Sequence, residues 1–90
     1  NIIIQGEKLK SIYLIRSGEV DALVDGRPVR RLERGEFAGS LPRLYNNLEA
    51  EYTFRNRGNV SLFELKREDI VQFVDRNPGL IMKFSYDLTE

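Results

Sequence analysis

Glycine residues divide the first half of the chain into strand-sized segments, and this spacing limits the available folds more than any other feature of the sequence. They stand at Gly6, Gly18, Gly26 and Gly35. Glycine adopts positive φ without steric cost, so glycines at such spacing mark turns between short strands. The spacing predicts an all-β meander, sandwich or roll.

A buried strand is predicted at residues 11–17. Its centre, Ile12 to Ile15, is a continuous run of residues with high apolar content and strong β propensity. The Ser-Gly pair at 17 and 18 predicts a turn at the end of this strand.

A β-hairpin is predicted around Asp25 and Gly26. The preceding residues, 19–24, alternate between apolar and polar, which is typical of a half-buried strand. An Asp-Gly pair suits the two positive-φ positions of a two-residue hairpin turn. The return strand is expected at residues 27–32 and a further turn at 33–36.

A short helix is predicted within residues 37–47, where the alternation stops. Ser40 is a good N-cap, and Pro42 falls in the first turn, where a backbone N–H has no helical partner to lose. Asn46 and Asn47 predict the end of this helix, because asparagine tolerates left-handed φ.

Alternation between apolar and polar residues resumes after this helix, at residues 50–55. A turn is expected at 56–59 and a last strand over 60–65. With the earlier segments this makes about seven short strands.

Helical periodicity replaces the alternation from Lys66 onward. Ile70, Phe73 and Val74 form one apolar stripe, and the Asn-Pro pair at 77–78 predicts both the end of this helix and the start of another. The second helix carries its own stripe, made of Leu80, Ile81, Phe84 and Leu88. Strands followed by helices predict a single α+β domain, mainly β, over residues 1–90.

The composition excludes several chemistries, because the 90 residues include no cysteine and no histidine. This removes disulfides, thiolate zinc sites, Ser-His-Asp chemistry and imidazole metal ligands. Fourteen basic residues balance fourteen acidic ones, so the net charge attracts neither nucleic acid nor an anionic membrane. The apolar runs are too short to span a bilayer. We therefore expect no enzyme activity, no metal, no nucleic-acid partner and no membrane partner, and a cytoplasmic location.

The order of these elements resembles the cyclic nucleotide-binding domain family, which includes bacterial catabolite activators, regulatory subunits of cAMP-dependent kinase and gating domains of channels. The segments that carry the resemblance are Ile12–Val20, Asp25–Arg27, Leu32–Phe37, Val60–Leu65, Arg67–Ile70 and Asn77–Pro78. The resemblance implies an antiparallel, jelly-roll-like β-roll with a short cassette helix and two C-terminal helices. The short helix that usually precedes the first strand is missing, so we expect that the domain lacks its N-terminal helix.

The resemblance also implies a cassette that holds a cyclic nucleotide. In the family an arginine pairs with the cyclic phosphate, and a glutamate accepts a hydrogen bond from the ribose 2′-hydroxyl. Here Ser40 stands at the glutamate position, and the arginine position falls within Leu48–Glu51, which contains no arginine. The candidate ligand-binding residues are Phe37, Gly39, Ser40, Leu41, Glu49, Ala50 and Glu51.

These replacements predict weak or no binding of cAMP and cGMP. A hydrogen bond to a charged group contributes about 1.5–3 kcal/mol, so the lost arginine lowers the affinity by roughly ten- to a hundredfold. A carboxylate beside the phosphate adds repulsion of about 1–4 kcal/mol at about 4 Å, depending on the dielectric. We expect a regulatory sensor domain of a larger signalling or transcription protein. The candidate ligands are a cyclic nucleotide, which the cassette disfavours, and another small molecule.

Several residues have two interpretations at this point. Arg43, Arg55 and Arg57 are either substitute phosphate ligands or solvated charges. Glu49 and Glu51 either bind a cation or lie on a solvent-facing side of a strand. In the same region the two aromatic residues at 52 and 54 either stack on a base or pack in the core.

Three interpretations concern the chain as a whole. It is either the sensor described above or a ligand-independent interaction module that forms a homodimer through its C-terminal helix. A cupin-like enzyme is the third interpretation, and the absence of histidine ligands argues against it. Any DNA binding would need a domain beyond Glu90.

Overall fold

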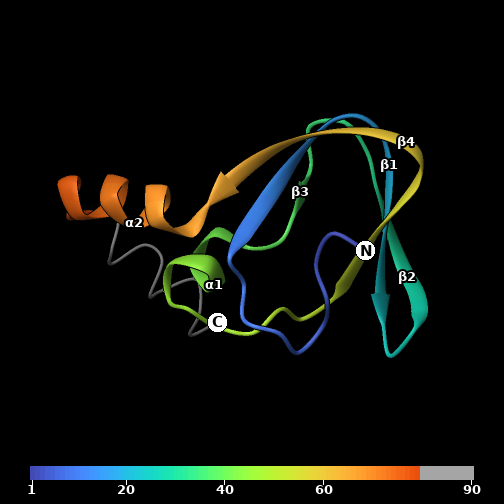
Figure 1. Cartoon of the computed structure of the whole chain (residues 1–90), viewed down its shortest axis with the longest axis horizontal. Coiled ribbons are helices and arrows are strands. Elements are labelled where there is room, and N and C mark those ends of the chain that lie inside the picture. Colours follow the sequence, from blue (N-terminus) through green and yellow to red (C-terminus); the bar gives the residue numbers. More distant parts are fainter. Residues whose placement is uncertain (80–90) are drawn as a thin grey trace.

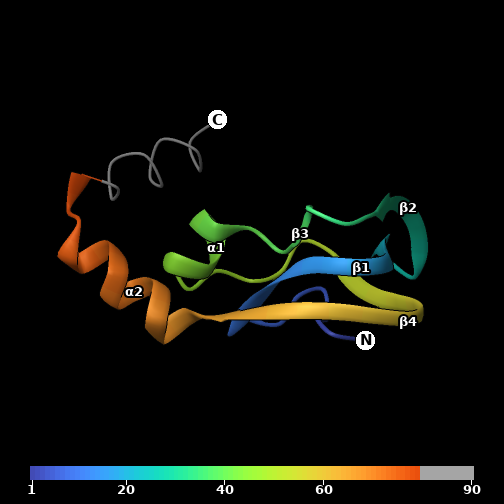
Figure 2. The ribbon, with the colours of Figure 1, turned by 90° about the horizontal axis from the view of Figure 1, so that it is seen from above.

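The computed structural model describes residues 1–79 and builds them into one antiparallel sheet with two helices. The elements in chain order are β1 (Ser11–Val24), β2 (Arg27–Leu32), β3 (Phe37–Ala38), α1 (Leu41–Tyr45), β4 (Thr53–Lys66) and α2 (Arg67–Arg76). Strand β1 is central, because β2 and β3 pair with it and β4 pairs with it along almost its whole length (Figure 1). Figure 2 shows α2 continuing from the end of β4, beyond the sheet and near α1.

Two strands are longer than the sequence predicted, so the expected total of about seven strands is wrong for the described residues. β1 and β4 each run for 14 residues, and the turns expected at residues 17–18 and 56–59 are absent. The register shifts there instead, so that residues 58–60 of β4 face the single Gly18 of β1. The same glycines that favour turns form a β-bulge, which bends a strand without ending it.

The hairpin and the short helix follow the prediction closely. Asp25 and Gly26 have φ of 52° and 81°, as a two-residue turn requires. Ser40 caps α1 by accepting a hydrogen bond of 3.3 Å from the backbone N–H of Arg43. Asn47, just beyond the helix, has a left-handed φ of 58°.

The core lies between the sheet, α1 and the N-terminal segment. Its most deeply buried members are Ile12, Ile15, Val20, Ala38 and Leu44. The N-terminal segment, for which the sequence predicted no strand, closes one side of the roll: Ile2 donates to the carbonyl of Phe54, and the Phe54 amide donates to Ile3, both at 2.9 Å.

One carboxylate is buried in the sheet and is compensated by arginine. The Asp21 side chain, on β1, is 7% exposed and accepts a hydrogen bond of 3.2 Å from Arg57 on β4. Arg31 on β2 approaches it to 3.9 Å. A buried charge without a partner is costly, so these two arginines allow the carboxylate to remain inside and tie three strands together.

Helix α2 buries only part of its predicted stripe. Val74 is fully buried and Ile70 partly so, but Phe73 is 58% exposed. Neither helix within residues 1–79 has the length and hydropathy of a membrane span. The second predicted helix, with Leu80, Ile81, Phe84 and Leu88, lies outside the described residues.

The bulge at Gly18 yields a stability prediction, with Gly35 as a matched control. Both glycines have a positive φ, 88° and 89°, but a Cβ at Gly18 would lie 2.5 Å from the Asn59 carbonyl oxygen, whereas one at Gly35 has no other atom within 4 Å. Gly35→Ala should cost about 1–2 kcal/mol of unfolding free energy from its φ alone. Gly18→Ala should cost about 1–3 kcal/mol more, because a backbone atom must also move. Urea unfolding measures both, and equal losses would contradict the assigned close contact.

Candidate functional site

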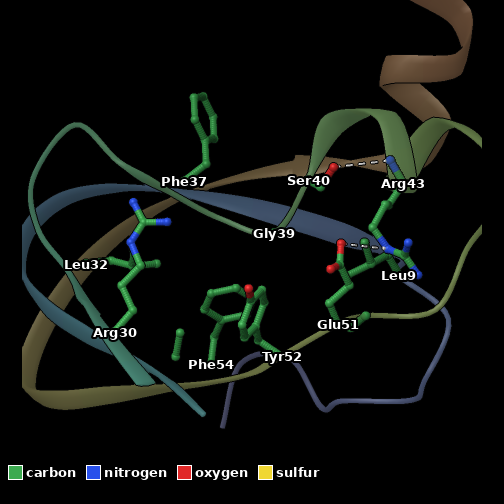
Figure 3. A pocket seen from close by; sticks show the side chains of 12 residues that line it. Leu9, Arg30, Leu32, Phe37, Gly39, Ser40, Arg43, Glu51, Tyr52 and Phe54 are labelled. Atoms are coloured by element: carbon green, nitrogen blue, oxygen red, sulfur yellow. Dashed lines mark hydrogen bonds and ion pairs between the residues drawn. The ribbon is translucent and has the colours of Figure 1, made fainter. Parts of the chain in front are cut away.

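A cavity of about 130 Å³ opens between the β1–β2 hairpin, β3, α1 and the segment that leads into β4 (Figure 3). Its walls are largely apolar, and a few polar groups project into it. The lining residues are Leu9, Ala22, Arg30, Leu32, Phe37, Gly39, Ser40, Arg43, Ala50, Glu51, Tyr52 and Phe54. An apolar hollow with a few polar groups is the usual form of a small-molecule site.

The structure brings five of the seven predicted site residues to this cavity. They are Phe37, Gly39, Ser40, Ala50 and Glu51. The other two, Leu41 and Glu49, do not line it. Leu41 packs against the core from the start of α1, and Glu49 is exposed and pairs with Lys8 in an isolated β-bridge.

Gly39 allows β3 and α1 to approach the central strand closely. Its φ is 108°, and a Cβ there would collide with the side chain of Ile12 on β1. Since Ile12 is fully buried, it has no room to yield. Glycine at this position therefore places the first turn of α1, with its cap Ser40, against one wall of the cavity.

Arg43 supplies a guanidinium beside the segment Leu48–Glu51, where the sequence resemblance predicts the arginine position. From α1, Arg43 reaches the Glu49 backbone carbonyl with Nε at 2.9 Å and Nη2 at 2.6 Å. Its Nε also lies 3.5 Å from Oε1 of Glu51. Of the three arginines considered from the sequence, Arg43 alone lines the cavity, whereas Arg57 pairs with Asp21.

Arg30, on β2, is a second cavity cation and is not among the site residues predicted from the sequence. Its Nη2 lies 2.8 Å from Oε1 of Glu36, whose other oxygen accepts a hydrogen bond of 2.7 Å from the Glu33 amide. This backbone hydrogen bond, with further help from Arg30, holds the pKa of Glu36 below its ordinary value. Arg30 stands two residues before the buried Leu32, so the strand period of two would have placed both on the cavity face.

The aromatic residues divide between core and cavity. Phe54 is buried, in agreement with the core interpretation, while Tyr52 is partly exposed and stands just before β4 begins at Thr53. Their ring centroids are 5.9 Å apart with the planes tilted by 58°. The Tyr52 ring is therefore supported by the core while it lines the cavity, as Figure 3 shows.

Arg67 links the cavity wall to α2. It is the first residue of α2, and its guanidinium donates to the carbonyls of Leu44 at 2.9 Å and Tyr45 at 3.0 Å, at the end of α1. Its backbone N–H donates to the Lys10 carbonyl at 2.9 Å. The last carbonyls of a helix lack an intrahelical donor and readily accept from basic side chains, and by donating to two of them Arg67 joins α1 to α2.

The cyclic nucleotide-binding domain family matches residues 1–77. The chain belongs to this family. Within it, the domain is similar in structure to the C-linker and CNBHD of zELK channels, crystallised in the presence of cAMP, with a TM-score of 0.78, 21% identity and coverage of 97% of this chain and 45% of that one. A comparison with curated proteins finds no match.

Two further solved structures resemble this cyclic nucleotide-binding domain. The catabolite activator protein of Thermus thermophilus is 27% identical with a TM-score of 0.71, over 98% of this chain and 43% of that one. The regulatory domain of Toxoplasma gondii PKA, crystallised with cAMP, is 30% identical with a TM-score of 0.63, over 73% of this chain and 26% of that one. The domain therefore spans less than half the length of these three chains.

The predicted family and fold class are confirmed by these findings. The domain is mainly antiparallel β with helices, as expected of a β-roll of this family. Among residues 1–79 no group of three or more acidic side chains is placed to hold a metal ion. The polar side chains that line its cavity belong to Arg30, Arg43, Glu51, Ser40 and Tyr52.

The Arg67 link can be tested by its contribution to stability. Arg67→Ala removes two charge-assisted hydrogen bonds, to the Leu44 and Tyr45 carbonyls, so it should lower the free energy of unfolding by about 2–3 kcal/mol. Arg34→Ala, in an exposed turn, should change it by less than about 0.5 kcal/mol. Thermal unfolding of both variants is the measurement, and equal effects would show that the link carries no stability.

Proposed function

We propose that this cyclic nucleotide-binding domain is the regulatory sensor of a larger signalling or transcription-regulating protein, and that it binds cAMP and cGMP weakly or not at all. Membership of the family supports the sensor role. Its similarity to parts of a channel, a catabolite activator and a kinase regulatory domain, each a longer chain, supports a place within a larger protein. A cytoplasmic location and the absence of catalysis belong to the same proposal, and the lack of histidine and cysteine supports them.

The observation that carries the weak-binding proposal is the engagement of both cavity cations by the domain itself. Arg43 is held by the Glu49 carbonyl and the Glu51 carboxylate, and Arg30 is held by Glu36. A cyclic phosphate gains most from a guanidinium that is free to pair with it. Here it must compete with acceptors that are already in place.

The mechanism we propose uses the Arg67 link. A ligand in the cavity contacts the wall formed by Arg43 and Ser40, and this wall is the start of α1. Arg67 holds the other end of α1 and begins α2. A ligand that favours one position of α1 therefore favours one position of α2, and an attached effector domain would respond to the position of α2.

Isothermal titration calorimetry with cAMP and with cGMP tests the proposal. We expect dissociation constants well above the low-micromolar range for both nucleotides. The regulatory domain of Toxoplasma gondii PKA, which was crystallised with cAMP, is the positive control under the same conditions. Low-micromolar binding of either nucleotide to this chain would refute the weak-binding proposal.

A second candidate function, a ligand-independent interaction module, is favoured by the exposed ring on α2. Phe73 is 58% exposed and lies on the helix that precedes the predicted dimerisation helix. Phe63 on β4 serves as the control, because it is the same residue type and is 52% exposed but lies on the sheet. If α2 takes part in a dimer interface, the sedimentation coefficient should rise with concentration across the micromolar range. Phe73→Ser should suppress that rise and Phe63→Ser should not. A chain that remains monomeric throughout would exclude this function.

A further inference from the structure

Both cationic side chains of the cavity are paired within the domain. Arg43 and Arg30 extend into the cavity from opposite sides (Figure 3), and each already has a carboxylate beside it. Arg30 pairs with Glu36 outside the lining, whereas Arg43 pairs with Glu51, which lines the cavity itself. Glu51 is therefore the negative charge that a ligand in this cavity meets directly.

Arg43 remains chemically able to hold an anion. A guanidinium carries five N–H donors, and Arg43 directs its Nε and one Nη2 hydrogen to the Glu49 carbonyl. Its contact with Glu51 is an ion pair at 3.5 Å rather than a short hydrogen bond. No other acceptor among residues 1–79 engages the Arg43 guanidinium. The Glu49 carbonyl fixes the guanidinium in the cavity wall, so removal of Glu51 would leave a cation that is already oriented.

Glu51 is free to act on ligands because it has no structural task of its own. Its side chain is 56% exposed, and among the described residues its polar contact is that with Arg43. Exposed ion pairs add little to stability. The effect of its charge on an anion bound to Arg43 is larger, because the two negative charges would then share one guanidinium and lie close together.

We infer that Glu51 determines the specificity of this cavity by acting as the internal counter-ion of Arg43, so that the site rejects anionic ring compounds and accepts uncharged ones. This inference rests on the proposed sensor function. It assigns the rejection of a phosphate to a single replaceable carboxylate rather than to the lack of an arginine. The apolar lining and the Tyr52 ring suit an uncharged planar compound equally well whether Glu51 is present or absent.

Glu49 offers a matched control two residues away. It carries the same charge and is exposed, but only its backbone carbonyl meets Arg43 and its side chain does not line the cavity. Glu49→Gln and Glu51→Gln therefore change the net charge of the chain equally. They differ in whether the lost charge stood inside the cavity.

The experiment titrates the wild-type chain and both variants with cAMP, an anion, and with adenosine, its uncharged counterpart. Glu51→Gln should raise the affinity for cAMP by at least about tenfold relative to Glu49→Gln, while the affinity for adenosine changes by less than about threefold. Adding Arg43→Ala to Glu51→Gln should abolish the gain for cAMP. Circular dichroism spectra and thermal unfolding verify that each variant is folded.

The outcomes separate this inference from the proposed function. Equal cAMP affinities of Glu51→Gln and Glu49→Gln, including undetectable binding by both, would overturn the role of Glu51. So would a gain that survives Arg43→Ala or that extends equally to adenosine. Tight binding of cAMP by the wild-type chain would instead refute the weak-binding proposal, whatever the ratio between the variants.

Discussion

Eleven residue pairs join β1 and β4 in the antiparallel ladder that positions everything else in the domain. β1 also carries β2 and β3, so the walls of the cavity are all attached to this one strand, directly or through their loops. At the other end of the ladder β4 passes directly into α2, which places Arg67 beside the Lys10 carbonyl. The register of this ladder shifts at Gly18, in a β-bulge where the partner backbone leaves no room for a Cβ.

Carboxylate–guanidinium pairs occur in two environments with different consequences. Asp21 is 7% exposed and lies between Arg31 and Arg57, so loss of either partner would expose a buried charge to an apolar interior. Glu51 is largely exposed and contacts Arg43 at a longer distance, so its pairing adds little stability and is easily exchanged. The first pair belongs to the scaffold, and the second belongs to a surface that a ligand can reach.

Local signals explain which features were predictable from the sequence. The Asp25–Gly26 turn, the Ser40 cap and the end of α1 before Asn47 depend on the conformational preferences of one or two residues, and all three appear as predicted. The fold class followed from the order of such elements along the chain. Five predicted cassette residues also meet in one cavity, because β3 and α1 are adjacent in the chain and the segment after α1 returns to the same edge.

Features decided by distant parts of the chain were not predictable in the same way. Gly18 and Gly58 predict turns when the sequence is taken locally. They lie in a β-bulge instead, because β1 pairs with β4 on both sides of them. Arg43 reads as one of three equivalent arginines, and only the approach of the Glu49 carbonyl singles it out. Arg30 carried a local signal in its spacing from Leu32, but its relevance depends on where β2 lies in the sheet.

The contacts around α1 set a limit on how the cavity can communicate with the rest of the chain. This helix is only five residues long, with Arg43 in the cavity wall and the carbonyls held by Arg67 at its end. A ligand shifts a conformational equilibrium only by the difference in its binding free energy between two states. A compound that touches only the aromatic wall near Tyr52 leaves Arg43 in place and has little such difference to offer. A compound that replaces Glu51 as the partner of Arg43 acts on the helix itself, so in this domain the residue that selects the ligand is also placed to decide whether binding is transmitted to α2.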